Sequence, residues 1–220
     1  IDMVLTSPPY DNLRDYKGYT FDFEGIAKEI YRVLKDGGVC VWVVGDATIK
    51  GSETGTSFKQ ALYFEEIGFN LHDTMIYEKN GFRFPCPNRY HQTFEYMFVF
   101  CKGKLKTFNG IKDRKNIHIN RRSRNMKRQR DGSKTFSKEY VSEEFGKRYN
   151  VWRYNIGGKK DFDHPAIFPD NLAEEHILSW SNEGDTILDP MAGSGTTLKM
   201  AKKNNRNYIG IEISPEYIDI

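Results

Sequence analysis

The chain has 220 residues, of which 38% are hydrophobic, and its 33 Lys and Arg against 30 Asp and Glu give a formal net charge of +3 at pH 7. At about 150 residues per domain, these values fit one domain with a large insertion and exclude a collagen, a wholly disordered chain and a mini-protein. Apolar runs such as Val39–Val44 reach only six residues, far short of the roughly 20 that cross a bilayer, so we expect no membrane span and no signal peptide.

The sequence begins inside an apolar segment. Its first residue is Ile1 rather than Met, and the apolar run is under way by residue 3. We therefore expect the natural N-terminus to lie upstream, and the last helix, after Ser214, to continue past Ile220.

The cysteines and histidines predict neither a disulfide nor a metal centre. Cys40, Cys86 and Cys101 are odd in number and lack C-x-x-C spacing, and Cys40 and Cys101 lie in apolar runs. This pattern is typical of buried thiols in a reducing compartment. The five histidines show none of the spacings of zinc ligands, so we expect no bound metal.

Strands and helices are predicted to alternate along most of the chain. The expected strands cover residues 2–6, 39–44, 69–78, 94–101, 185–189 and 207–213. The expected helices cover residues 23–34, 57–67, 171–180 and 196–204. This alternation predicts an α/β fold with a doubly wound, mostly parallel sheet that binds ligands at the carboxyl ends of its strands.

Positive charge is concentrated in one segment. Residues 103–160 hold 18 Lys and Arg but only 5 Asp and Glu, whereas the rest of the chain holds 15 against 25. A solvated surface would explain any single arginine, but an excess of this size inside an acidic protein favours a polyanionic partner. We therefore divide the chain into residues 1–102, a basic insertion at 103–160, and residues 161–220. The side chains expected to contact the polyanion are Arg121, Arg122, Arg124, Lys127, Arg128 and Arg130.

A glycine-rich turn joins the predicted strand at 185–189 to the helix that follows. Gly193 and Gly195 allow a ligand to approach the backbone closely, and the helix N-terminus beyond them offers unpaired N–H groups. Glu212 ends the next strand, where an acidic residue can accept hydrogen bonds from a ribose. A third glycine and a Walker lysine are lacking, which disfavours nicotinamide and ATP. Taken alone, a plain strand-to-helix connection is the alternative interpretation of this turn.

A second motif, Ser7-Pro8-Pro9-Tyr10, follows the first strand. The two prolines fix an extended backbone and donate no N–H group. The Ser7 hydroxyl and a carbonyl of the turn can then both accept hydrogen bonds from one amino group, and Tyr10 offers an aromatic face to a planar base. An ordinary strand-terminating turn is the alternative.

Together the two motifs resemble motifs IV and I of the S-adenosylmethionine-dependent DNA amino methyltransferases. Their order, with the catalytic motif first, the basic segment next and the cofactor motif last, is similar to the β class of that family. The stretch from His164 to Pro169 resembles motif X, which closes over the methionine part of the cofactor. The resemblance covers nearly the whole chain and implies the class I methyltransferase fold. Residues 1–102 then form its catalytic half, 103–160 the target-recognition insertion and 161–220 its cofactor-binding half.

The resemblance also implies the site residues. The catalytic residues would be Ser7, Pro8, Pro9 and Tyr10. The residues around S-adenosylmethionine would be Asp189, Met191, Ala192, Gly193, Ser194, Gly195, Thr196, Glu212, His164 and Phe168. The implied reaction is transfer of a methyl group to the exocyclic amino group of a base flipped out of DNA. Within the family, serine at position 7 is associated with cytosine N4, so we favour cytosine, with adenine N6 as the alternative.

The implied partner is double-stranded DNA, in the cytoplasm and at the nucleoid of a bacterial or phage system. The resemblance is compatible with a cognate restriction endonuclease and with a monomer or a homodimer. Three other functions are less favoured by the sequence. Pro85-Cys86 is the dipeptide that carbon-5 cytosine methyltransferases use for covalent attack, but their motif order is the reverse. An inactive nucleic-acid-binding module would not need the serine and tyrosine, and a protein-amide methyltransferase would not need the basic insertion.

Overall fold

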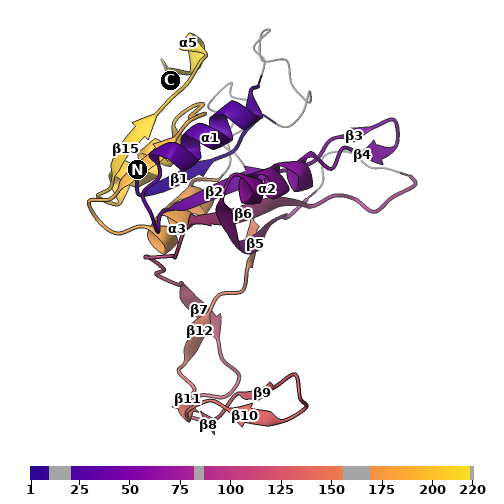
Figure 1. The fold of residues 1–220 in the computed structure, drawn as a ribbon, viewed down its shortest axis with the longest axis vertical. Coiled ribbons are helices and arrows are strands. Elements are labelled where there is room, and N and C mark those ends of the chain that lie inside the picture. Colours follow the sequence, from indigo (N-terminus) through magenta and orange to yellow (C-terminus); the bar gives the residue numbers. More distant parts are fainter. Residues whose placement is uncertain (10–20, 82–86, 156–168, 219–220) are drawn as a thin grey trace. The chain divides into compact units, whose positions relative to one another are not determined.

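The computed structural model describes residues 1–9, 21–81, 87–155 and 169–218 (Figure 1). The chain divides into two compact units. One comprises residues 1–109 and 150–220, and the other comprises residues 110–149. We call them the central unit and the arm, and describe each by itself.

The central unit is built on a seven-stranded sheet in the order β13-β5-β6-β2-β1-β14-β15. Its strands are β1 (Met3–Thr6), β2 (Val39–Val44), β5 (Phe69–Lys79), β6 (Phe94–Lys102), β13 (Val151–Tyr154), β14 (Thr186–Asp189) and β15 (Asn207–Gly210). The two pairings made by β6 are antiparallel, and the other four are parallel. The predicted α/β fold with a mostly parallel sheet is therefore confirmed.

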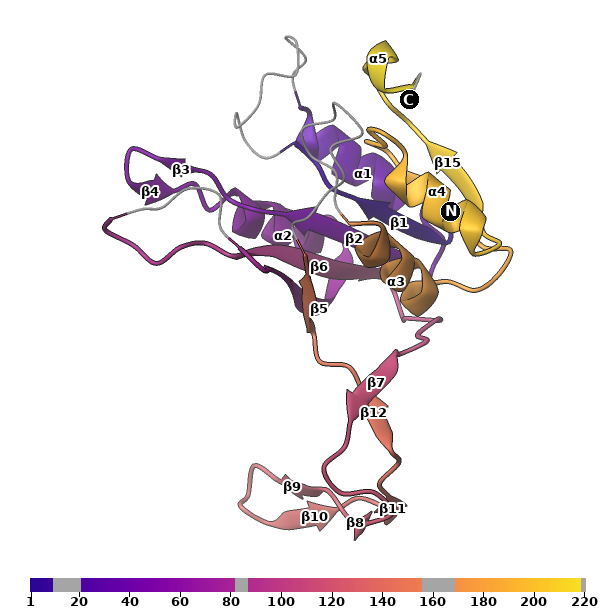
Figure 2. The same cartoon turned by 180° about the vertical axis from the view of Figure 1, so that it is seen from behind.

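Helices cover both faces of this sheet. They are α1 (Phe23–Val33), α2 (Thr56–Glu66), α3 (Asp170–Trp180), α4 (Thr196–Lys203) and the short α5 (Pro215–Ile218). Helices α1 and α2 lie on one face, and α3 and α4 lie on the other (Figures 1 and 2). In the described part of the chain, no helix has the length and apolar character needed to span a membrane.

The core between the sheet and helices α1 and α2 is aromatic. Trp42, Phe64 and Phe100 are fully buried, and the rings of Phe64 and Phe100 stack with their centroids 4.5 Å apart. The indole N–H of Trp42 donates a hydrogen bond to Gln60 Oε1 at 2.9 Å, so that the buried polar edge of this side chain is paired. Strand β2 is buried along its whole length, as expected for a central strand covered on both faces.

The order in which strands are added to the sheet reverses between β1 and β14. From β1 the chain runs through α1 to β2 on one side, whereas from β14 it runs through α4 to β15 on the other side. The parallel pair β1 and β14 is therefore the topological switch point of the sheet. In open α/β sheets, ligands bind in the crevice beyond the carboxyl ends of such strands.

The arm is a single stretch of chain folded back on itself through three nested antiparallel pairs. Strand β7 (Lys112–Lys115) pairs with β12 (Phe145–Lys147), β8 (Arg122–Ser123) with β11 (Tyr140–Val141), and β9 (Met126–Arg128) with β10 (Lys134–Phe136). At the tip, Gly132 has a φ of 85°, and Asp131 accepts hydrogen bonds from the backbone and side chain of Ser133.

The arm is shorter than the basic insertion predicted at 103–160. Strand β13, near the end of that range, pairs with β5 and belongs to the central sheet. Trp152 of β13 is 6% exposed and lies against the ring of His176, with the centroids 4.6 Å apart. Trp152 thus joins the central core, although the surrounding sequence is basic.

Candidate active site

The two motifs singled out in the sequence begin side by side, at the carboxyl ends of β1 and β14. Thr6, the last residue of β1, donates a hydrogen bond from Oγ1 to Asp189 Oδ1 at 2.7 Å, and both side chains are buried. Ser7, Pro8 and Pro9 follow Thr6 directly, just as Pro190 and the glycine-rich turn follow Asp189. This one contact joins segments 183 residues apart and brings both motifs to the switch point of the sheet.

Asp189 is held inside the protein. Its exposed fraction is 2%, and it accepts hydrogen bonds from Thr6, from the hydroxyl of Thr197 and from the backbone N–H of Met191. Loss of hydration raises the pKa of this carboxyl to about 6, although the three hydrogen bonds oppose the rise. Asp189 therefore links β1, β14 and α4 and sets where the turn begins.

The glycine-rich turn is tied to the segment that follows β15. Gly193 and Gly195 have φ values of 52° and 81°, in the left-handed region that glycine adopts without strain. Glu212 accepts a hydrogen bond from the Gly193 N–H through Oε2 at 2.7 Å and one from the Ser214 N–H through Oε1 at 2.9 Å. Each carboxylate oxygen has a second lone pair, so the half-buried Glu212 can accept further hydrogen bonds at this edge.

Helix α4 begins at this turn. Its N-cap is Gly195, and no side chain caps it. The first backbone N–H groups of a helix lack partners within the helix and favour a negatively charged or polar ligand. Of the predicted cofactor residues, Met191, Ala192, Ser194 and Thr196 are half-buried along the turn and at the start of α4.

Gly210 of β15, which the sequence interpretation did not select, determines how closely α4 can pack on the sheet. A Cβ atom added at Gly210 of β15 would lie 2.4 Å from Leu198 Cδ1 and 3.2 Å from Ala192 Cβ. The absence of a side chain therefore lets both α4 and the glycine-rich turn pack closely on β15. The available signal was a glycine within a predicted strand, which often marks a close approach of other atoms. Thr6 and Thr197 were missed as well, since single threonines carry no such signal.

The loops around β2 and β6 meet at the same edge of the sheet. Asp46, just after β2, accepts hydrogen bonds from the N–H of Ser57 at 2.9 Å and from its hydroxyl at 2.5 Å, which fixes the start of α2. Arg89, just before β6, donates to the carbonyl of Gly51 at 2.6 Å. Gly51 lies in the turn between β3 (Thr48–Ile49) and β4 (Ser52–Glu53), so Arg89 ties this hairpin to the β5–β6 connection.

Some predicted residues cannot be placed. Tyr10, His164 and Phe168 lie outside the described residues, as does the Pro85-Cys86 dipeptide. Cys40 and Cys101 are buried free thiols, in agreement with the sequence interpretation. The six basic residues expected to contact a polyanion all lie on the arm, and all are exposed.

The sequence of residues 1–220 matches the family model described as DNA methylase. The chain belongs to this DNA methylase family. It is 60% identical over 229 residues to the orphan methyltransferase M.BamHII of Bacillus amyloliquefaciens, an alignment that covers 100% of this chain and 86% of the relative.

Solved structures agree with this assignment. The crystal structure of the M1.HpyAVI–SAM complex aligns with a TM-score of 0.65 at 26% identity, over 100% of this chain and 86% of that one. The cytosine-N4-specific PvuII DNA methyltransferase aligns with a TM-score of 0.70 over 99% of this chain and 77% of that one, and at 20% identity it supports the fold alone. The protein is a DNA amino methyltransferase, and its family uses S-adenosylmethionine, which confirms the predicted class of enzyme, fold and cofactor.

The residues at the switch point fit this cofactor. Glu212 presents a carboxylate able to accept hydrogen bonds from two neighbouring hydroxyls, as a ribose carries. At Gly193 and Gly195 themselves, no side chain keeps a ligand from the backbone.

Proposed function

We propose that this enzyme methylates the exocyclic amino group of a base flipped out of double-stranded DNA, with cytosine N4 preferred over adenine N6. The observation that carries the proposal is the Thr6–Asp189 hydrogen bond, because it sets the Ser7-Pro8-Pro9 segment beside the glycine-rich turn. A base bound at the Ser7-Pro8-Pro9 segment and a cofactor bound at the glycine-rich turn would therefore be neighbours. Reaction within such a site depends on the two groups meeting in a fixed geometry.

In this proposal the cofactor is held by the turn at 191–196 and by Glu212, which accepts hydrogen bonds from the ribose hydroxyls. Asp189 supports the turn from inside the protein through the N–H of Met191. When bound, S-adenosylmethionine supplies an electrophilic methyl group on its sulfonium. His164 and Phe168 are proposed to close over the methionine part, as the family resemblance implies.

The amino group of the base is proposed to be oriented by acceptors rather than deprotonated by a strong base. The Ser7 hydroxyl and the Pro8 carbonyl each accept one of its N–H bonds, which directs the nitrogen lone pair toward the methyl group. Pro9 keeps the backbone extended, and Tyr10 stacks on the base. Because an amino nitrogen conjugated to the ring is a weak nucleophile, orientation and electrostatics contribute most of the rate.

Access to this site requires the target base to leave the duplex. The arm, with 13 Lys and Arg against 5 Asp and Glu in residues 110–149, is proposed to bind the phosphate backbone. The residues of the arm proposed to contact DNA, through its phosphates or its bases, are Arg121, Arg122, Arg124, Lys127, Arg128 and Arg130. Contacts to phosphates set the position on DNA, whereas contacts to base edges select the sequence.

A pair of substitutions tests the proposed roles. We expect Ser7→Ala to lower the rate of methyl transfer at least a hundredfold while calorimetry shows nearly unchanged binding of S-adenosylmethionine. Glu212→Ala should instead weaken cofactor binding. Equal loss of cofactor binding in both variants would contradict the assignment of Ser7 to the base. Mass spectrometry of nucleosides from the methylated DNA should detect N4-methylcytosine, and N6-methyladenine in its place would overturn the preferred base.

A further inference from the structure

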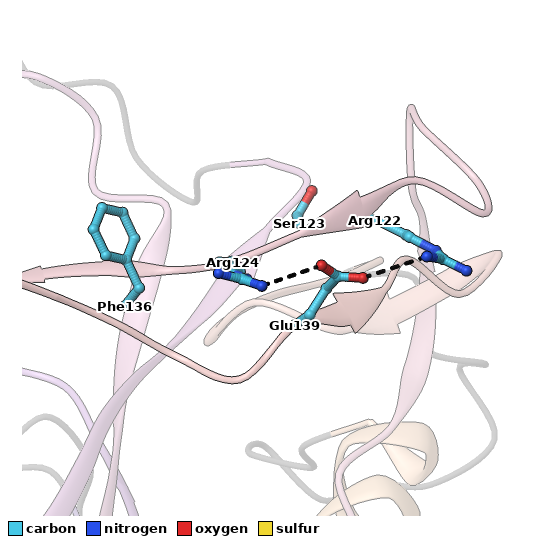
Figure 3. A pocket seen from close by; sticks show the side chains of 5 residues that line it. All are labelled: Arg122, Ser123, Arg124, Phe136 and Glu139. Carbon is cyan, nitrogen blue, oxygen red and sulfur yellow. Dashed lines mark ion pairs between the residues drawn. The ribbon is translucent and has the colours of Figure 1, made fainter.

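The arm carries a pocket that no role so far described accounts for (Figure 3). It is a hollow of about 360 Å³ that is open to solvent. The lining residues come from strands β8 and β10 and from the residues next to β8 and β11. They are Arg122, Ser123, Arg124, Phe136 and Glu139. Pairing of β8 with β11 and of β9 with β10 brings these side chains together, so the hairpin itself builds the pocket.

Glu139 lies between two guanidinium groups (Figure 3). Its Oε1 is 3.8 Å from Arg122 Nη1, and its Oε2 is 3.6 Å from Arg124 Nη2. Strong charge-assisted hydrogen bonds are shorter, at about 2.7–2.9 Å. The side chains of Arg122, Arg124 and Glu139 are 80%, 61% and 43% exposed, and ion pairs this loose and wet add little stability. Each group can therefore exchange its partner for a ligand at small cost.

Three other acidic side chains of the arm, those of Asp113, Asp131 and Glu143, have structural partners. Asp113 pairs with Arg148 across the base of the hairpin, and Glu143 pairs with Lys112 at 2.6 Å. Asp131 accepts the hydrogen bonds that form the tip turn. Glu139 differs because its carboxylate faces the pocket beside an exposed aromatic ring, that of Phe136.

A carboxylate in this place works against a phosphate ligand. Negative charge in the pocket repels the DNA backbone, which the rest of the arm attracts. Two guanidinium groups, which donate hydrogen bonds, lie on either side of one carboxylate, which accepts them. This arrangement complements a ligand that carries hydrogen-bond acceptors next to an amino group. In the major groove a G·C pair has that pattern, since guanine offers O6 and N7 as acceptors and cytosine offers the N4 amino group.

We propose that this pocket reads a G·C base pair in the major groove of the DNA substrate. One guanidinium, which we assign to Arg124, donates to guanine O6 and N7, and Glu139 accepts from cytosine N4. Arg122 stays beside Glu139, while Phe136 contacts a neighbouring base. The inference rests on the proposed function, because it takes DNA as the ligand of the arm.

Glu139→Gln in the full chain tests this role. The amide keeps the size of the side chain but adds a donor where only an acceptor should face cytosine. Duplexes with a randomised segment are selected by binding, and the enriched sequences are compared with those of the unaltered chain. We expect preference for G·C at one position to fall about tenfold or more, while affinity for unrelated DNA rises because a negative charge is removed. Glu139→Asp, which keeps the acceptor, should retain that preference.

The matched control is Glu143→Gln, which makes the same charge change on the same arm but alters an ion pair with Lys112. It should raise affinity for unrelated DNA and leave the enriched sequence unchanged. The proposal is overturned if Glu139→Gln behaves like this control, if Arg124→Ala weakens binding to all sequences equally, or if the unaltered chain enriches no sequence. Because selection measures binding and not methylation, the two proposals can fail separately. If Glu139→Gln loses the sequence preference but the unaltered chain yields no methylated product, only the proposed methyl transfer is contradicted.

Discussion

Asp189 shows how one side chain both joins two motifs and makes stability depend on pH. It is 2% exposed, and its hydrogen bonds from Thr6, Thr197 and Met191 only partly replace the lost hydration. The pKa of this carboxyl is therefore raised to about 6 in the folded chain, against 3.8 in an unfolded one. A raised pKa means that the folded state binds the proton more tightly than the unfolded state does.

The contribution of Asp189 to stability should therefore increase as the pH falls. As the pH falls from about 7 through 6 toward 4, Asp189 becomes protonated in the folded state first, so its contribution to the free energy of unfolding rises, by up to about 3 kcal/mol. Asp189→Asn cannot be protonated in this range and should lose that gain. Urea unfolding at several pH values between 4 and 7 measures the difference. Parallel pH profiles for the two proteins would show that Asp189 does not titrate as inferred.

His176 of α3 has the opposite effect. Its ring is fully buried. The Nδ1 atom of His176 accepts a hydrogen bond from the indole N–H of Trp180 at 3.3 Å, and Nε2 lies 3.1 Å from the sulfur of Met97. Burial lowers the pKa of this imidazole from 6.5 to about 3. The folded state thus holds His176 neutral, while the unfolded chain takes up a proton below pH 6.5, so this part of the stability is lost as the pH falls from 6.5 toward 3.

We expect His176→Leu to flatten the fall in stability between pH 6.5 and 4. At pH 7 the same variant should be less stable by about 1–3 kcal/mol, because the buried N–H of Trp180 loses its acceptor. Thermal unfolding, followed by near-ultraviolet circular dichroism at pH 7, 6.5 and 4, gives the loss of stability at pH 7 and the fall in stability between pH 6.5 and 4. An unchanged slope in the variant would mean that another group governs acid unfolding.

At the scale of elements, the unit from β14 through α4 to β15 depends on close packing at Gly210. In Gly210→Val, the new Cβ would lie only 2.4 Å from Leu198 Cδ1 and 3.2 Å from Ala192 Cβ, and the two methyl groups would crowd these atoms further. We expect a loss of about 1–3 kcal/mol of stability from overpacking, and weaker cofactor binding because Ala192 is part of the turn. Leu198→Ala in the same chain should recover part of both losses. Denaturant unfolding and calorimetry of the two single variants and the double variant measure this coupling, and purely additive effects would contradict it.

Elements with a strong local signal could be predicted. Strand β2 is a run of apolar residues, and its predicted bounds are those observed. The glycine-rich turn could be recognised because strand, glycines and helix follow one another within a few residues. The contact between Thr6 and Asp189 could not be predicted from spacing, since 183 residues separate them and it arises only when β1 and β14 become neighbours.

The strands of the arm were missed for a different reason. They are two to four residues long and mostly exposed, so they lack the alternation of apolar and polar residues that marks a strand with one buried face. Strand β13 was assigned to the basic insertion because its neighbours in sequence are charged. Its burial depends on pairing with β5, which no local pattern indicates.

At the scale of the whole molecule, a net charge of +3 conceals two oppositely charged parts. The arm holds 13 basic and 5 acidic residues, so the remaining 20 basic and 25 acidic residues leave the central unit negative. Affinity for DNA should therefore come mostly from the arm, whereas a negative central unit discourages unspecific binding of DNA away from it. Binding should also depend strongly on salt, because each neutralised phosphate releases counterions.

Replacing the six basic arm residues by glutamine tests this division. The variant changes Arg121, Arg122, Arg124, Lys127, Arg128 and Arg130. If the four that do not line the pocket at Glu139 each contact one phosphate, the slope of log Kd against log salt should become shallower by about 4, as measured by fluorescence anisotropy with a labelled duplex. The charge-matched control replaces six exposed basic residues of the central unit, namely Lys28, Arg32, Lys35, Lys59, Lys202 and Lys203. The control should keep the slope of the unaltered chain, and both proteins should bind S-adenosylmethionine normally. Equal changes of slope in the two variants would mean that net charge alone, rather than the arm, attracts DNA.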